Sequence, residues 1–444
     1  MSEPAHLTVD PLYREGIARS CKVHLGYREF LTPGFVIRID SREKLSLYLK
    51  LKKKYKLEHV TGYVVRLADA QRVLGQRISD TQVDLQGRFV EGDFLKSSLS
   101  DLILIDPALE NLYYATHAGD FASTRNLPHA LTDYSLSYLK QKSVQKNKEE
   151  IVETPETGIR KWLDAKHGHF WQELELDERI RTRFIRDLLV RQHELGAPIL
   201  IPPVPLITND RLFELTKTIN RKSSEVSRVV GECADAFTFR LDVLRNSSLL
   251  EELRDYIDAQ NARITLFKFK YMNLNEEDRV IERKNFRDFL QTLDLKSRLD
   301  RNRTFMLLEA GNLAYACAGR GFDFLSTSFS LDREDRVRKQ QRSPWGKWFD
   351  PYYQVTLDRD SFMDAYRNNG SHIPCDCPEC TTSTSKPESL GIDEWNQFVK
   401  GHYLSRRNKD YTEIAKAIES GTATAGIVDR LRDSALKNLL ELVR

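Results

Sequence analysis

Segment 306–330 reads "MLLEAGNLAYACAGRGFDFLSTSFS": two short apolar runs separated by a longer stretch rich in Ala and Gly. Short apolar runs bounded by Gly and polar residues predict buried strands. A long connection between two such strands predicts a crossover that leaves them parallel in one sheet. The segment therefore predicts a strand–helix–strand unit.

The same alternation extends outward from this segment over most of the chain. Eight runs rich in Val, Ile, Leu and Phe are separated by longer, largely amphipathic stretches; they span 32–40, 58–69, 101–109, 197–207, 236–244, 262–272, 304–313 and 321–330. Eight strand–helix units predict an α/β fold of the (β/α)8 TIM-barrel type, with a doubly wound sheet as the alternative. Pro202, Pro203 and Pro205 lie in the fourth run and suit the end of a strand better than its middle.

Three intervening segments carry clear helix signals. Segments 41–55 and 177–196 are amphipathic, and the second ends in Gly196, a typical C-cap residue. Segment 246–261 begins with Asn and Ser, which are preferred N-caps. These helices support the alternation of strands and helices that a barrel requires.

Length and charge set the broad organisation. The chain has 444 residues, of which 40% are hydrophobic and 30% charged, enough for a sizeable core. We expect an N-terminal extension over 1–30, a barrel over 31–370 with a polar linker near 140–158, and a C-terminal lobe over 371–444. Because 68 basic residues balance 65 acidic ones, any nucleic-acid surface is a local patch. Candidate patches are 50–56, 332–349 and 403–409, each of which could instead be a solvated helix face.

The N-terminal sequence predicts a cytoplasmic protein. "MSEPAHLTVDPLYREG" has no apolar signal core, and no run of about 18 apolar residues occurs in the chain. We therefore expect no membrane association, and thiols that stay reduced.

Three of the six cysteines lie in "IPCDCPEC" (373–380), as Cys375, Cys377 and Cys380. Thiols at C-x-C-x-x-C spacing can converge on one zinc ion at about 2.3 Å. We expect zinc as the cofactor and His402 as its fourth ligand, with His372 as the competing candidate. A disulfide or unligated thiols are the alternatives. The remaining cysteines are expected to be small buried hydrophobes: Cys21, Cys233 and Cys317.

The cysteine cluster, a histidine some twenty residues later, and the segment 306–330 before it together resemble the tRNA-guanine transglycosylase family. In that family a strand leads through a helix to a G-[IV]-D-x-F-D motif; here "GFDFLS" (321–326) has the same layout, and "FLSTSF" is similar to D-S-x-S variants of the archaeal and DNA-acting branches. The resemblance implies a barrel, a zinc lobe, and a guanine or 7-deazaguanine base in tRNA or DNA. It also implies a homodimer or a heteromeric partner.

Polar residues at the predicted strand ends are the candidate site. The resemblance places Ser326 where the family carries its nucleophilic aspartate, and Asp106 where it carries its other active-site aspartate. We expect Asp106, Asp323 and Ser326 as catalytic candidates, because reactive groups of a barrel lie at the C-terminal ends of its strands. Substrate-binding candidates are Asp242, Lys270 and Glu309. Each aspartate could instead cap a helix, Glu309 could be structural, and Arg240 could pair with Asp242.

Three functions remain open at this point. The first is a transglycosylase-like enzyme that flips a base into the barrel mouth. The second is a catalytically degenerate subunit that recognises a deazaguanine, free or on a macromolecule, within an antiphage (CBASS-like) assembly. The third is a non-catalytic, zinc-stabilised interaction module that exposes the aromatic segment 343–353.

Overall fold

The computed structural model describes residues 7–15, 18–25, 28–74, 101–109, 171–172, 174–260, 262–270, 285–286, 288–291, 303–309, 317–327, 345–351, 355–370, 372–373, 375–382 and 386–422. The linker predicted near 140–158 and most of the patch predicted over 332–349 lie outside these residues. The chain divides into two compact units. Unit 1 comprises 1–6, 65–91 and 103–272, and unit 2 comprises 7–64, 92–102 and 273–444.

Unit 2 begins with an antiparallel sheet that the sequence analysis did not anticipate, formed in the order β1 (Leu7–Glu15), β2 (Ala18–Leu25) and β3 (Arg28–Thr32). A run of parallel strands follows, in the order β12 (Thr304–Leu308), β13 (Phe324–Thr327), β4 (Gly34–Arg38) and β5 (Val60–Arg66), whose last two residues belong to unit 1. Strands from both ends of the sequence are therefore neighbours in one sheet.

Helix α1 (Arg42–Tyr55) connects β4 to β5 and has well-defined ends. The side chain of Ser41 accepts a hydrogen bond from the backbone N–H of Lys44, which satisfies an N-terminal donor. Lys56 ends the helix in the left-handed conformation, at φ 47°. The basic segment 50–56 therefore forms the last turns of this helix.

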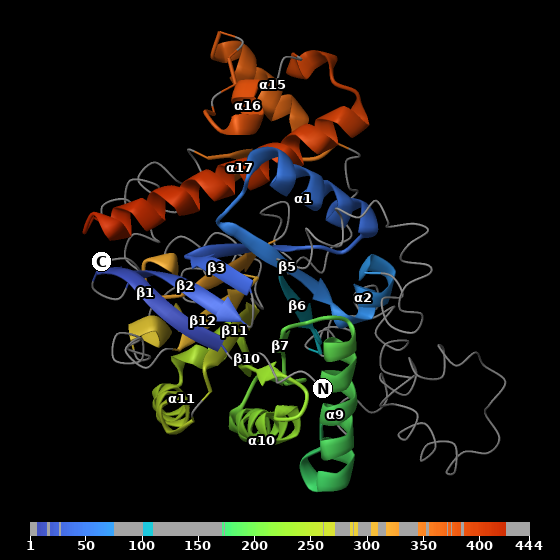
Figure 1. Ribbon diagram of the computed structural model, residues 1–444, viewed down its shortest axis with the longest axis vertical. Helices are drawn as coiled ribbons and strands as arrows, with labels where there is room; N and C mark the ends of the chain where they lie inside the picture. Colours follow the sequence, from blue (N-terminus) through green and yellow to red (C-terminus); the bar gives the residue numbers. More distant parts are fainter. Residues whose placement is uncertain are drawn as a thin grey trace, which may run out of the picture. The chain divides into compact units, whose positions relative to one another are not determined.

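The C-terminal lobe of unit 2 is helical around a short hairpin (orange to red in Figure 1). Its elements are β14 (Trp348–Asp350), β15 (Val355–Leu357), α15 (Arg359–Asn368), α16 (Pro378–Thr382), the 3-10 turn η3 (Pro387–Ser389) and α17 (Ile392–Glu419). The long helix α17 contacts α16 and β14, and it also contacts α1, β1, β2 and β4. One helix thus joins the lobe to the strands of unit 2.

Unit 1 contains two runs of parallel strands. One is β6 (Leu102–Asp106), β7 (Ile199–Leu200) and β9 (Glu232–Cys233); the first residue of β6 belongs to unit 2. The other is β8 (Leu206–Ile207), β10 (Asp235–Arg240) and β11 (Ile264–Lys270). The helices in the described part of this unit include α2 (Leu67–Leu74), α9 (Glu178–Glu194), α10 (Asp210–Ser227) and α11 (Ser247–Ala259), with the 3-10 turn η1 (Leu241–Arg245).

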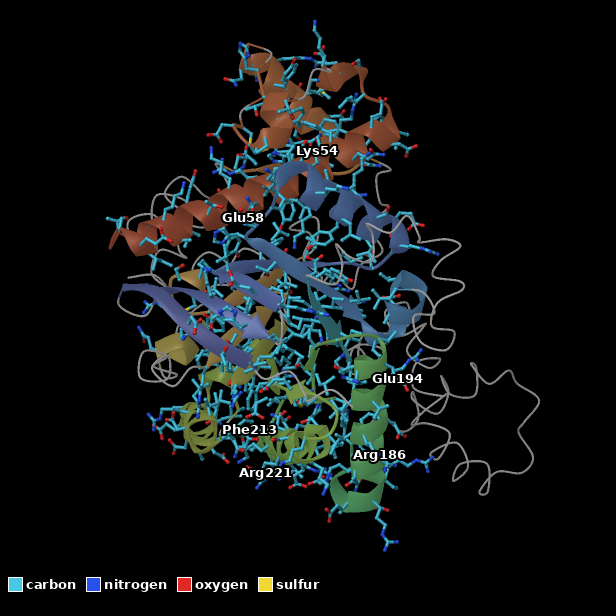
Figure 2. All side chains as sticks on the ribbon, in the orientation of Figure 1. Lys54, Glu58, Arg186, Glu194, Phe213 and Arg221 are labelled. Atoms are coloured by element: carbon cyan, nitrogen blue, oxygen red, sulfur yellow. The ribbon has the colours of Figure 1, made fainter. Side chains whose placement is uncertain are left out.

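Strands β10 and β11 have an aromatic face and a polar face because side chains alternate along a strand. Phe237 and Phe239 of β10 stack on their register partners Phe267 and Phe269 of β11. Phe213 of α10, labelled in Figure 2, packs against this aromatic face. The opposite face, with Thr238, Arg240 and both lysines of β11, therefore points away from α10.

Each of the eight predicted strand runs contains a strand, and the helices predicted over 41–55, 177–196 and 246–261 are α1, α9 and α11. Gly196 follows α9 with φ 81°, and the side chain of Asn246 caps α11, as expected. The three prolines of the fourth run lie between β7 and β8. The chain is a mixed α/β protein with parallel strands, consistent with a TIM-like barrel; closure into eight strands stays a prediction.

Gly62 of β5 packs closely against the backbone at the start of β6. A Cβ atom at this position would lie 2.0 Å from the carbonyl oxygen of Leu102, at the start of β6. Only glycine leaves room for that contact.

None of the described helices combines the length and the apolar character that a membrane crossing requires.

Candidate metal centre and strand-end residues

Four side chains of the C-terminal lobe converge on one point. The sulfur atoms of Cys375, Cys377 and Cys380 and a ring nitrogen of His402 all lie within 4.8 Å of one another. The Nδ1 atom of His402 lies 3.4 Å from the sulfur of Cys377 and 3.2 Å from that of Cys380. Tetrahedral ligands at zinc distances lie roughly 3.5–3.8 Å apart. The group could therefore hold a metal ion.

The imidazole of His402 is oriented for this role. Its Nε2 atom lies 2.6 Å from the carbonyl oxygen of Phe349, so Nε2 carries the proton and donates it. Nδ1 then presents its lone pair to the three sulfurs, in the arrangement usual for a metal-ligating histidine. The ring stacks on Trp348 at 4.7 Å and is fully buried. His372 is exposed and outside the group.

Contacts within the group shift the pKa values of His402, Cys375 and Cys380. Burial lowers the pKa of His402, but the sulfurs of Cys375 and Cys377 raise it to about 10. Hydrogen bonds with Cys377 and Cys380 lower the pKa of Cys375, whereas hydrogen bonds with Cys375 and Cys377, together with burial, raise the pKa of Cys380. Three thiolates at this separation would repel one another unless a cation lay between them, and a metal ion could be that cation.

An aromatic core surrounds the cysteines. Cys377 and Cys380 are buried in one cluster together with large side chains from β14, α15 and α17: Trp348, Phe362, Tyr366, Trp395 and Phe398. Trp348 lies in β14 and Phe398 in α17. The indole N–H of Trp395 donates a hydrogen bond to the carbonyl of Gly346 at 2.7 Å. The described part of segment 343–353 therefore packs inward at Trp348 and Phe349, which argues against its use as an exposed aromatic surface.

Glu379, between two of the cysteines, ties α16 to α1. Its carboxylate accepts a hydrogen bond from the hydroxyl of Tyr55 and lies 3.6 Å from the ammonium of Lys54, which is labelled in Figure 2. A Cβ atom at Gly401 would lie 2.8 Å from the same carboxylate, so glycine in α17 makes room for it. The conformation of the cysteine loop is thus coupled to the basic end of α1.

Ser326 and Glu309 meet in unit 2. The backbone N–H of Glu309 donates to the hydroxyl of Ser326 at 3.0 Å, and Ser326 is fully buried. Glu309 has φ 57°, and its carboxylate lies 3.1 Å from the guanidinium of Arg38 at the end of β4. The hydroxyl of Ser326 therefore holds a backbone turn, and the carboxylate of Glu309 beside it pairs with an arginine.

Asp323 precedes β13 and is held at the opposite end of that strand from Thr327. Its carboxylate accepts two hydrogen bonds from Arg19 of β2, at 2.9 and 2.7 Å, and one from the backbone N–H of Phe305 at 2.9 Å. Both partners of the ion pair are buried. This environment favours a structural role that anchors the N-terminal sheet over a catalytic one.

Asp106 forms a buried ion pair in unit 1. One carboxylate oxygen lies 2.5 Å from the ammonium of Lys268, and the other accepts the backbone N–H of Ala108 at 2.9 Å. The Lys268 side chain is 1% exposed and that of Asp106 10%. Lys268 was not among the residues predicted from the sequence, although "LFKFK" places two lysines on one face of a strand.

Asp242 and Lys270 lie at the ends of neighbouring strands. The guanidinium of Arg240 donates through Nε to Asp242 at 2.5 Å, which confirms the pairing considered above. Arg240 and Lys270 are register partners in β10 and β11, and Lys270 is buried. Three candidate residues of unit 1, Asp106, Asp242 and Lys270, thus belong to or contact the polar face of these two strands.

No protein-family model matches the chain, and no curated protein matches its sequence.

Proposed function

We propose that this chain is a transglycosylase-like protein that handles a guanine or 7-deazaguanine base, with a structural zinc in its C-terminal lobe. The observation that carries the proposal is the Cys375–Cys377–Cys380–His402 group, which follows the strand β13 at the spacing of the family that the sequence resembles. The polar residues at the carboxyl ends of β10 and β11 in unit 1 support a ligand site.

Zinc is the metal that this donor set favours. Three sulfurs and one imidazole nitrogen form a tetrahedral set without an open position, which is typical of structural zinc sites. One zinc per chain, measured by elemental analysis of the purified protein, is the expected result. A stable protein that contains no metal contradicts this part of the proposal.

Recognition without base exchange is the second candidate, and specific contacts favour it. At the family's nucleophile position the Ser326 hydroxyl accepts a backbone N–H, and a hydroxyl needs an adjacent base to attack a sugar carbon. Both oxygens of Asp106 are engaged, by Lys268 and by Ala108. We infer that the chain binds its base more readily than it exchanges it, as a degenerate subunit of a cytoplasmic antiphage (CBASS-like) assembly would.

One experiment separates the functions. The purified protein is incubated with labelled guanine and tRNA or DNA, and in parallel with a labelled 7-deazaguanine. Incorporation into the polymer supports the enzyme, and binding without incorporation supports the degenerate subunit. If the protein neither incorporates nor binds either base, the remaining function is the zinc-stabilised interaction module. Size measurement of the same sample tests the expected homodimer or heteromeric partner.

A further inference from the structure

The polar face of β10 and β11 concentrates positive charge in a small area. Thr238 and Lys268 are register partners, and so are Arg240 and Lys270 two residues further on. Neighbouring strands lie about 4.8 Å apart and residues two apart on one strand lie about 6.7 Å apart. The backbone positions of Arg240, Lys268 and Lys270 are therefore close enough for their side chains to contact a single small anion.

The character of this face changes along the strands. At its beginning lie Ala236 and Leu266, which are buried and apolar. The cations come only toward the carboxyl ends, where parallel strands bind ligands. If this face were only structural, apolar residues would stabilise it at least as well as buried charges, because they carry no desolvation penalty. The position of the cations therefore indicates a ligand.

Asp106 pairs with Lys268 and Asp242 pairs with Arg240, and the two carboxylates differ in exposure. Asp106 is nearly buried and fixed on both oxygens, so it stabilises the ammonium of Lys268 as a permanent counter-ion. Asp242 lies in the turn η1, its side chain is 37% exposed, and its partner Arg240 is 22% exposed. This second pair is accessible, and an incoming anion can replace a carboxylate at a guanidinium because both offer paired oxygens.

We propose that the polar face of β10 and β11 is a phosphate-binding subsite. Arg240 and Lys270 contact the phosphate, and the ammonium of Lys268, which is positioned by Asp106, adds positive charge earlier on the same face. A phosphate suits two or three converging cations better than a carboxylate, because it carries more charge and more acceptor oxygens. The hydroxyl of Thr238 is a further donor on this face. The subsite does not depend on which base the protein recognises, and it goes beyond the proposed function.

The test measures binding of the full-length protein to four probes by calorimetry: inorganic phosphate, guanosine 5′-monophosphate, guanosine, and a single-stranded oligonucleotide. We expect the monophosphate or the oligonucleotide to bind at least about tenfold more tightly than guanosine. Tighter binding of the monophosphate identifies a free nucleotide as the source of the phosphate, and tighter binding of the oligonucleotide identifies a nucleic-acid backbone.

Arg240→Gln is the decisive variant, because Arg240 is partly exposed and its loss leaves the buried pair intact. It should weaken binding of the phosphate-bearing probe about tenfold. Lys270→Gln should do the same, and correct folding of each variant is checked by its melting curve. Arg254→Gln is the control, since Arg254 also contacts a neighbouring aspartate, Asp255, but lies on the exposed surface of α11. The proposal is overturned if neither the monophosphate nor the oligonucleotide binds more tightly than guanosine, or if Arg240→Gln leaves binding of the phosphate-bearing probe unchanged, whatever the outcome of base exchange.

Discussion

At the residue scale, Asp106 and Lys268 form a buried ion pair, so a substitution of either residue changes stability as well as function. Removing one partner of a buried pair leaves the other charge without compensation, which costs about 3–5 kcal/mol. Asparagine at 106 can still accept the N–H of Ala108 but cannot neutralise the ammonium. A loss of function in a single variant could thus reflect lost stability.

We therefore expect Asp106→Asn to lower the free energy of unfolding by about 3–5 kcal/mol. The double variant Asp106→Asn, Lys268→Met should recover most of that loss, because no uncompensated charge remains. Urea unfolding of the wild type, both single variants and the double variant checks this as a thermodynamic cycle. Additive losses in the double variant would show that the two residues do not interact in this way.

For Ser326 we expect a structural effect. Ser326→Ala leaves the buried N–H of Glu309 without its acceptor, which costs about 1–3 kcal/mol. Any base-exchange or binding activity should stay within about tenfold of the wild type. The control is Ser389→Ala, where an exposed hydroxyl bonds a nearby carbonyl and stability should change little. Loss of activity by several orders of magnitude with unchanged stability would establish Ser326 as catalytic.

At the element scale, the close approach of β5 to the start of β6 makes one glycine critical. An added methyl at Gly62 would lie 2.0 Å from a backbone carbonyl, which cannot move as a flexible side chain can. Gly62→Ala should therefore destabilise the protein by about 3 kcal/mol or more. Gly231→Ala is the control, because its added methyl meets only side-chain atoms at 3.9 Å or more. Comparable melting temperatures of the two variants would contradict this packing.

His59, just before β5, makes stability depend on pH. Burial lowers the pKa of His59 despite the carbonyl of Pro33, which lies 2.9 Å from Nδ1, and despite the charges of Glu58 and Glu419. The unfolded chain takes up a proton near pH 6.5, whereas the folded chain does so only at lower pH. This contribution to stability is complete above about pH 6.5 and is lost as the pH falls below that value.

We expect the wild type to lose more stability than His59→Gln between pH 7.5 and pH 5.5. Glutamine can retain a donor toward Pro33 but does not titrate, so the difference between the two proteins isolates the histidine. Urea unfolding at both pH values provides the measurement. Identical pH dependence in both proteins would mean that His59 does not titrate differently on folding.

The sequence predicted the elements better than the contacts between them. All eight strand runs were recognisable because buried parallel strands are continuous apolar runs, and the cysteine group because its spacing is local apart from one histidine. The N-terminal sheet was missed because β1 carries polar residues and a proline. Lys268 was missed because its partner lies 162 residues away, and no local pattern encodes that pairing.

At the scale of the whole molecule, a metal ion held by the cysteine–histidine group would stabilise more than the C-terminal lobe. His402 lies in the middle of α17, and this helix also contacts α1, β1, β2 and β4 in unit 2. Because a structural metal contributes its binding free energy to folding, its loss should loosen α17 and the elements that pack on it.

Removal of the metal with a chelator should therefore lower the melting temperature by at least about 10 °C. It should also expose residues 371–404 to proteolysis. Cys377→Ser should show the same two effects and no further shift with chelator, whereas Cys233→Ser, outside the group, should respond as the wild type does. A chelated protein with an unchanged melting curve would show that the centre is not structural.

The ion pair between Arg19 and Asp323 has a consequence for the order of synthesis. The two residues are 304 positions apart, so a ribosome that adds 5–20 residues per second makes Asp323 roughly 15–60 s after Arg19. During that interval β1 and β2 exist as a nascent hairpin, and isolated hairpins are marginally stable. Strands β1 and β2 are thus made long before this ion pair can secure them, and a message truncated before the codon for Asp323 yields a chain in which Arg19 never receives this partner.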